Sequence, residues 1–319
     1  MKISVLGCGR WGSFLAWYTD RLGNDVACYG RESSLSYRIL KENRRNEYVA
    51  FADSIELTCD LEYAVARADV VIISLSAQSL RGFLKQFTEF DLGGKKFVLC
   101  MKGIEEQSGK RLSEVAAESG LDKKSVAVWL GPGHIQDFVK GIPNCMVIDS
   151  YDPALTRALA DLFRSDLIRF YYGDDMIGNE TGAAAKNVMG IVAGMLDGLG
   201  LASLKGPLMA RGAREVSRLI AALGGNSMSA YGLCHLGDYE TTLFSRFSHN
   251  RGWGEAYTKG ENFSRLAEGV PTAAALARLS ERVGVEMPIT NAVYDMIRFR
   301  TPPMEVLSSL FGRNPKKEF

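Results

Sequence analysis

The chain has 319 residues, more than one hydrophobic core usually supports, so its length predicts two domains. Lysine and arginine together number 38, and aspartate and glutamate number 37. A net charge of +1 gives no sign of the basic surface that binds nucleic acid or a membrane. We therefore expect neither among the partners of this protein.

The cysteines and the amino terminus indicate a cellular location. Six cysteines are scattered along the chain, mostly inside apolar runs, and no Cys-x-x-Cys pair occurs. This pattern is typical of free thiols in a reducing compartment, so we expect a cytoplasmic protein. The three histidines lack metal-ligand spacing, so we expect no metal site. Residues 1–6 are too short for a signal peptide, and no later stretch approaches the roughly 20 apolar residues of a membrane span.

A glycine-rich turn follows the first expected strand. Residues 3–6 are a short β-rich run, residues 13–22 have a helical pattern, and Gly7, Gly9 and Gly12 lie between them. Gly7 permits a tight turn, Gly9 lets backbone N–H groups approach a pyrophosphate, and Gly12 lets the helix pack closely on the strand. The helix N-terminus adds partial positive charge beside the phosphates. The motif predicts a bound dinucleotide.

The end of the second expected strand bears on the choice of cofactor. The strand at residues 26–29 is followed by Gly30, Arg31 and Glu32. A carboxylate here would bind the ribose 2′-hydroxyl of NAD, whereas an arginine suits the 2′-phosphate of NADP. Because Arg31 comes first, we favour NADPH without excluding NADH. The alternative is that Arg31 is a solvated loop residue.

The remaining strands of the first half complete a Rossmann domain. Strands that alternate with helices predict a doubly wound, mostly parallel sheet in an α/β domain. Lys102 and Gly131 each follow an expected strand, at the edge where open parallel sheets bind ligands. We expect both to lie near the first glycine turn. The strands are expected at residues 70–73, 96–99, 126–129, 145–148 and 167–171, with a helix at 153–163.

Helical patterns replace the strands near residue 175. This change predicts an NAD(P)-binding domain over residues 1–175 and an all-α substrate and catalytic domain over residues 176–319. Residues 245–254 are polar and rich in glycine, so we expect an irregular functional segment there. The helices are expected at residues 179–199, 206–223, 270–283, 288–299 and 303–310.

The first of these helices carries an unusual lysine. Lys186 stands among small and apolar residues, and Gly182 and Gly190 lie one turn to either side on the same face. Each glycine costs the helix roughly 1 kcal/mol relative to alanine, so another part of the chain or a ligand should come close at this face. Lys186 is then a desolvated lysine that transfers a proton. The alternative is a core-helix lysine whose head reaches water.

These motifs resemble the bacterial type of NAD(P)-dependent glycerol-3-phosphate dehydrogenase over essentially the whole chain. The resemblance implies an N-terminal Rossmann domain followed by an all-α domain of the 6-phosphogluconate-dehydrogenase-like type, in a protein that is commonly a homodimer. It lies in an ordered set of motifs: Gly7–Gly12, Lys102-Gly103, Gly131-Pro132, Gly182–Asn187, Leu236-Gly237-Asp238, Ser248-x-Asn250-Arg251, Glu268-Gly269 and Val285–Thr290.

The resemblance also implies an activity and a role for each matching residue. The expected reaction is the reversible reduction of dihydroxyacetone phosphate to sn-glycerol 3-phosphate with NADPH or NADH, without a metal, for phospholipid synthesis. Lys186 is the expected proton donor and acceptor, and Lys102 and Asp238 are the other catalytic residues. The cofactor would contact Gly7, Gly9, Arg10, Trp11, Gly12, Arg31, Lys102, Ile135, Arg251 and Glu268. The substrate would contact Lys102, Gly131, Gly133, Lys186, Asp238, Ser248, His249, Asn250 and Arg251.

Some positions depart from the family's pattern. Gly133 stands where the family usually has Ser or Thr, and Ile135 where it has Ala. His249 replaces an arginine that would bind phosphate in a bidentate way, and Arg246, or Arg251 with helix N-termini, could take its place. The alternatives are therefore a related two-domain reductase of another small ketone, such as ketopantoate, or a protein that binds NAD(P)H without turnover.

Overall fold

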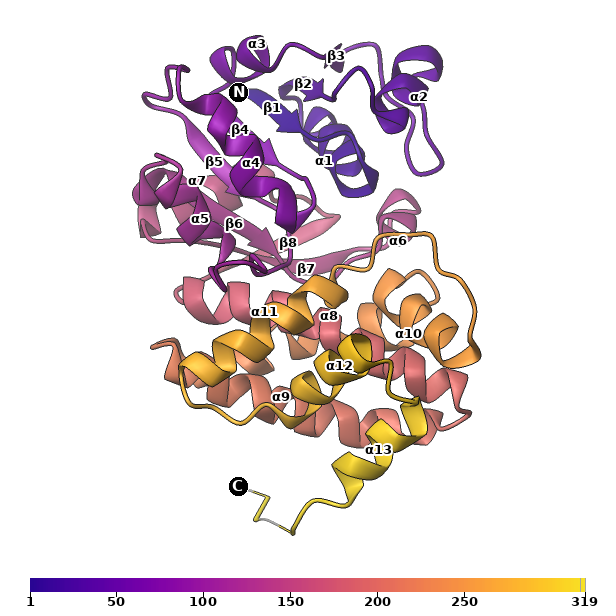
Figure 1. Ribbon diagram of the computed structural model, residues 1–319. Coiled ribbons are helices and arrows are strands. Elements are labelled where there is room, and N and C mark those ends of the chain that lie inside the picture. Colours follow the sequence, from indigo (N-terminus) through magenta and orange to yellow (C-terminus); the bar gives the residue numbers. More distant parts are fainter. Residues whose placement is uncertain (316, 319) are drawn as a thin grey trace. The chain divides into compact units, whose positions relative to one another are not determined.

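The computed structural model describes residues 1–315, 317 and 318, and the chain divides into two compact units (Figure 1). Unit 1 contains residues 1–102 and 110–180, and unit 2 contains residues 103–109 and 181–319. The chain crosses from unit 1 to unit 2 for the last time between Glu180 and Thr181, inside the long helix α8 (Met176–Gly198). The sequence predicts two independently folding domains, residues 1–175 and 176–319, and these bounds stay a prediction.

Unit 1 is built on one eight-stranded sheet with the order β3-β2-β1-β4-β5-β6-β7-β8. Every neighbouring pair is parallel except β6 and β7, which are antiparallel. The strand order reverses between β1 and β4, the place where such sheets bind nucleotides. The strands are β1 (Lys2–Leu6), β2 (Asp25–Tyr29), β3 (Glu56–Thr58), β4 (Val70–Ile73), β5 (Lys96–Leu99), β6 (Val126–Leu130), β7 (Asn144–Ser150) and β8 (Ile168–Tyr172).

The helices of unit 1 pack on this sheet through aromatic and aliphatic side chains. The ring of Phe14 in α1 stacks on that of Phe138 in α6 with centroids 5.1 Å apart, and Trp129 of β6 lies 4.9 Å from Phe163 of α7. All four rings are fully or almost fully buried, so they fix the helices firmly. The helices are α1 (Arg10–Arg21), α2 (Leu35–Asn43), α3 (Leu61–Ala66), α4 (Leu80–Leu84), α5 (Leu112–Glu118), α6 (Ile135–Val139) and α7 (Pro153–Phe163).

Unit 2 is helical, and α8 is its central element. A Cβ atom at Gly194 of α8 would lie 1.9 Å from the carbonyl oxygen of Arg251 in α10, and a Cβ atom at Gly269 of α11 would lie 2.6 Å from that of Asn187. Glycine thus lets two helices approach the backbone of α8 closely. The helices are α8 (Met176–Gly198), α9 (Lys205–Ala222), α10 (His249–Lys259), α11 (Gly269–Arg282), α12 (Pro288–Phe299) and α13 (Pro303–Phe311).

One expectation about this half is wrong. Residues 245–254 are not irregular throughout, because α10 begins at His249. The Ser248 side chain caps this helix by accepting a hydrogen bond from the Arg251 N–H at 3.3 Å, and Gly260 ends it with a φ of +69°. In the part of the chain that the structure describes, no helix combines the length and hydropathy of a membrane span.

Candidate active site

The turn between β1 and α1 has the shape that a pyrophosphate requires. Gly7 has a φ of +111°, and a Cβ atom there would lie 2.2 Å from the Ser74 carbonyl oxygen. A Cβ atom at Gly12 would lie 1.7 Å from the Gly7 carbonyl oxygen, whereas one at Gly9 would meet no atom within 4 Å. Gly7 and Gly12 therefore permit close packing, and Gly9 leaves its surface open to a ligand.

The N-terminus of α1 is electrostatically suited to an anion. Gly9 is its N-cap, no described side chain caps it, and its first turn holds no acidic residue. The N–H groups of a helix's first turn have no partner inside the helix and carry partial positive charge. Arg10 adds a full charge, with its guanidinium 5.7 Å from the Tyr48 ring, and Trp11 packs on Phe14 with centroids 5.0 Å apart. These features fit the cofactor that the motif predicts.

Two other predicted residues of unit 1 are joined directly. The Lys102 Nζ donates a hydrogen bond to the Gly131 carbonyl oxygen at 2.6 Å. This bond links the segments that follow β5 and β6, so the lysine lies at the carboxyl edge of the sheet, as expected. Arg31 follows β2 and is exposed. Its contact with the cofactor stays a prediction.

The departures at residues 133 and 135 have a physical explanation. A Cβ atom at Gly133 would lie 2.3 Å from the ring of Phe138. That ring is buried against Phe14, so it has little freedom to move. A serine or threonine at residue 133 would collide with it. Ile135 begins α6 and is 1% exposed, so its side chain belongs to the same packed layer.

Lys186, the lysine that the sequence predicts to be catalytic, belongs to a buried polar cluster of unit 2. The Lys186 Nζ lies 3.0 Å from Asp238 Oδ2 and donates a hydrogen bond to Thr242 Oγ1 at 2.7 Å. Lys186 is 8% exposed and Asp238 is 1% exposed. The Thr241 hydroxyl also donates to Asp238. A buried ammonium that is held by a carboxylate and a hydroxyl has a fixed orientation.

The glycines on either side of Lys186 predict that another group lies close to this face of α8, and in the structure these groups are side chains of unit 2. A Cβ atom at Gly182 would lie 3.0 Å from the Cβ of His235, and one at Gly190 would lie 2.9 Å from the Cγ2 of Thr242. The two glycines therefore admit the residues that surround the lysine. Thr242 was not predicted from the sequence. It lies in the π-helical segment Glu240–Phe244, which follows the turn of Asp238 and brings the threonine hydroxyl to Lys186.

The residues of α10 fall into two groups. Asn250 bridges two helices, since its Nδ2 donates to Asn187 Oδ1 at 3.0 Å and its Oδ1 accepts from the Gly269 N–H at 2.8 Å. It thereby lies next to the Lys186 turn. Arg251 is engaged elsewhere, with its Nε 2.5 Å from Asp197 Oδ2 and a second contact to Glu255 at 3.5 Å.

Two further predicted residues are His249, the first residue of α10, and Glu268, which follows that helix in the chain. The Nδ1 of His249 donates to the Leu266 carbonyl oxygen at 3.2 Å, because a carbonyl can only accept. Its ring lies 6.3 Å from that of Phe263. Glu268 is the N-cap residue of α11. Both are partly exposed.

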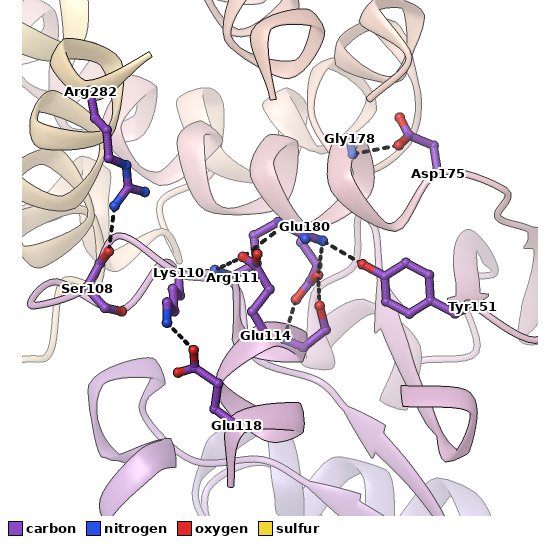
Figure 2. A network of polar contacts seen from close by, with 11 residues as sticks. Ser108, Lys110, Arg111, Glu114, Glu118, Tyr151, Asp175, Gly178, Glu180 and Arg282 are labelled. Atoms are coloured by element: carbon purple, nitrogen blue, oxygen red, sulfur yellow. Dashed lines mark hydrogen bonds and ion pairs between the residues drawn. The ribbon is translucent and has the colours of Figure 1, made fainter. Parts of the chain in front are cut away.

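Within unit 1, a buried carboxylate holds the first residues of α8, as Figure 2 shows. Glu180 accepts hydrogen bonds from Arg111 at 3.1 Å and from the Ser113 N–H at 2.9 Å. Arg111 also donates to Tyr151 Oη at 3.1 Å, and Asp175 Oδ1 accepts from the Gly178 N–H at 3.0 Å. Burial raises the pKa of Glu180, whereas the charge of Arg111 and the hydrogen bonds from Ser113 lower it. The helix that carries Lys186 thus starts from a specific anchor.

Comparison with known proteins accounts for both halves of the chain. The model for the N-terminus of NAD-dependent glycerol-3-phosphate dehydrogenase matches residues 2–156, and the model for its C-terminus matches residues 175–308. The glycerol-3-phosphate dehydrogenase (NAD(P)+) of Pelodictyon phaeoclathratiforme is 35% identical over 100% of this chain and 99% of its own length. The chain belongs to the NAD-dependent glycerol-3-phosphate dehydrogenase family.

Solved structures agree with this membership. The crystal structure of glycerol-3-phosphate dehydrogenase from Coxiella burnetii has a TM-score of 0.90 and 26% identity, over 98% of this chain and 99% of that chain. The ketopantoate reductase of Ralstonia eutropha has a TM-score of 0.62 at 14% identity, over 96% and 100%. The second likeness shows the fold alone. The expected fold class, a Rossmann domain followed by an all-α domain, is confirmed.

Proposed function

We propose that this protein reduces dihydroxyacetone phosphate to sn-glycerol 3-phosphate, reversibly and with NAD(P)H, and so supplies glycerophospholipid synthesis. The observation that carries the proposal is the buried Lys186–Asp238 ion pair on the central helix of unit 2. It occurs in a chain that matches glycerol-3-phosphate dehydrogenases over its full length. A ketone reductase needs a positioned proton donor, and an ammonium held in this way supplies one.

The reaction divides into a hydride transfer and a proton transfer. When bound, the reduced nicotinamide supplies a hydride to the carbonyl carbon of the substrate. Lys186 gives a proton from Nζ to the carbonyl oxygen, which completes the alcohol, and the lysine then regains a proton from solvent. Asp238 and Thr242 both hold the ammonium, so its position and orientation are fixed before the substrate binds.

Lys102 has a different role in this proposal. Its ammonium donates a hydrogen bond to the Gly131 carbonyl oxygen, which holds the positive charge at the carboxyl edge of the sheet. We assign it to the stabilisation of negative charge that develops on the carbonyl oxygen, and to contacts with both cofactor and substrate. Gly131 and Gly133 would lie beside the substrate at the same edge of the sheet.

The phosphate group would bind at the beginning of α10. Ser248 caps this helix, and His249 and Asn250 form its first turn, where backbone N–H groups favour an anion. Arg251 contributes to the start of the helix through its N–H, while its guanidinium is held by Asp197. Phosphate recognition would then rest on α10 and His249 rather than on a bidentate arginine.

The cofactor would lie on unit 1. The open surface of Gly9 and the uncapped N-terminus of α1 accept the pyrophosphate, with Gly7, Arg10, Trp11 and Gly12 around it. Arg31 would favour the 2′-phosphate of NADPH, without excluding NADH. Ile135, Arg251 and Glu268 are the remaining proposed contacts.

We further propose that the protein is a cytoplasmic homodimer. All six cysteines are free thiols, and most are buried, which suits a reducing compartment. The mass of the protein in solution, measured by light scattering, would test the dimer.

The proposed activity is tested with three substrates in one assay. NADPH oxidation should be rapid with dihydroxyacetone phosphate, slow with dihydroxyacetone and absent with ketopantoate. Faster turnover of ketopantoate would identify a different reductase of the same fold. Tight NADPH binding without turnover of any ketone would identify a nucleotide-binding protein instead.

A further inference from the structure

His235 is a fully buried histidine with no part in the proposed reaction, and it directly precedes the turn that carries Asp238. Its Nδ1 lies 2.8 Å from the Gly182 carbonyl oxygen, and its Nε2 lies 2.7 Å from Tyr239 Oη. The centroids of the His235 and Tyr239 rings are 4.8 Å apart, and the angle between the ring planes is 68°. One side chain therefore bonds to α8 and to the residue that follows Asp238.

The hydrogen bonds assign the protons of this pair. A carbonyl oxygen only accepts, so Nδ1 carries a proton, and Nε2 accepts from the Tyr239 hydroxyl. Burial lowers the pKa of His235 to about 4 and raises the pKa of Tyr239, so both are neutral at neutral pH. The charged groups that face them are Lys186 and Asp238 at the imidazole and Glu215 at the phenol. The donors and acceptors of both rings are matched.

The positions of these contacts connect the pair to the functional lysine. Gly182 precedes Lys186 by one helical turn, so its carbonyl is the regular acceptor for the Lys186 N–H. The imidazole thus bonds to the turn that ends at Lys186. His235 and Tyr239 also flank the turn that carries Asp238, and the hydrogen bond between them closes that turn. The same two side chains hold the backbone on both sides of the ion pair.

We propose that His235 and Tyr239 are positioning residues that set the geometry of the Lys186–Asp238 pair. Neither touches the substrate. They hold the turn of Asp238 against the turn of Lys186, so that Nζ and Oδ2 remain 3.0 Å apart during turnover. The inference rests on the proposed role of Lys186 as proton donor. If the pair only filled space, apolar rings of the same size would serve equally well.

Three substitutions separate positioning from packing. Tyr239→Phe removes one oxygen atom and keeps the ring. His235→Asn keeps a donor where Nδ1 lies and loses the group at Nε2, and His235→Leu removes both bonds. Tyr257→Phe is the matched control, because its phenol donates to the Met296 carbonyl at 3.2 Å between two other helices of the same unit.

The measurements are kcat, the two KM values, the solvent deuterium isotope effect on kcat, and the melting temperature. We expect about tenfold lower kcat for Tyr239→Phe, equal to ~1.4 kcal/mol, and roughly 100-fold for His235→Leu, with His235→Asn between them. The KM for NADPH should stay within about twofold of wild type, because the variants change none of the residues proposed to contact the cofactor. The solvent isotope effect should rise, since proton transfer becomes slower, and Tyr257→Phe should match wild type.

Lys186→Met in the same assay distinguishes two failures. If Lys186→Met is inactive while folded Tyr239→Phe and His235→Leu keep the wild-type kcat and isotope effect, the positioning role is overturned. If Lys186→Met keeps its turnover, the proposed function itself fails. Should His235→Leu not fold, Tyr239→Phe decides the matter alone, because its packing is preserved.

Discussion

Replacement of Asp238 by asparagine should both destabilise the protein and disable it. The carboxylate is 1% exposed and lies 3.0 Å from an ammonium whose side chain is only 10% exposed. Removal of one partner from a buried ion pair leaves an uncompensated charge and typically costs about 3–5 kcal/mol. Thr242 still accepts from Nζ, and the asparagine oxygen still accepts from Thr241, so we expect the lower end, about 3 kcal/mol.

The assay is urea unfolding together with steady-state kinetics. Asp161→Asn is the control, because Asp161 pairs with Arg164 at 3.6 Å on the surface, with both side chains more than half exposed. Such a pair contributes at most about 1 kcal/mol. Asp238→Asn should unfold at clearly lower urea and lose at least about 100-fold in kcat. Equal unfolding midpoints and an unchanged kcat would refute the buried pair as the support of the lysine.

Further predictions concern unit 1. Gly9→Val should keep the melting temperature and raise the KM for NADPH about tenfold, whereas Gly12→Ala should lower the melting temperature because its Cβ meets the backbone of the glycine turn. Arg31→Ala should reduce the preference for NADPH over NADH by about tenfold in kcat/KM. Burial raises the pKa of Asp149 from 3.8 to about 6, so the folded protein binds a proton more readily than the unfolded chain between these values. Its stability should fall as the pH rises from about 4 to 6, and Asp149→Asn should remove that fall and be ~2 kcal/mol more stable at neutral pH, as measured by thermal unfolding.

The parts of the fold that could be predicted are those with long, unambiguous patterns. The apolar run at residues 70–73 and the glycine turn after residue 6 indicated a parallel sheet, and both elements occur. β3 was missed because three residues carry no usable periodicity, and α2 was missed as well. The polar composition of residues 245–254 predicts an irregular segment, but α10 begins there, with Ser248 and Gly260 at its two ends.

Residues of the site could be predicted from the sequence only where the residue type and its neighbours indicate a particular chemistry. Lys186, with glycines on either side, is predicted to be the catalytic lysine, a role that stays a prediction, and the structure pairs it with Asp238, the carboxylate that the resemblance places beside it. Thr242 and His235 were missed, since a threonine or histidine in the sequence gives no indication of what it will face. Their roles depend on tertiary packing that brings a later segment against α8.

The most direct measurement is the rate of dihydroxyacetone phosphate reduction by Lys186→Met, with NADPH binding measured on the same sample by fluorescence. The account predicts wild-type affinity for NADPH and a kcat lower by about 1,000-fold, because an alkyl side chain has no proton to give. A kcat within about tenfold of wild type, with the cofactor bound normally, would contradict the assignment of Lys186 as the proton donor.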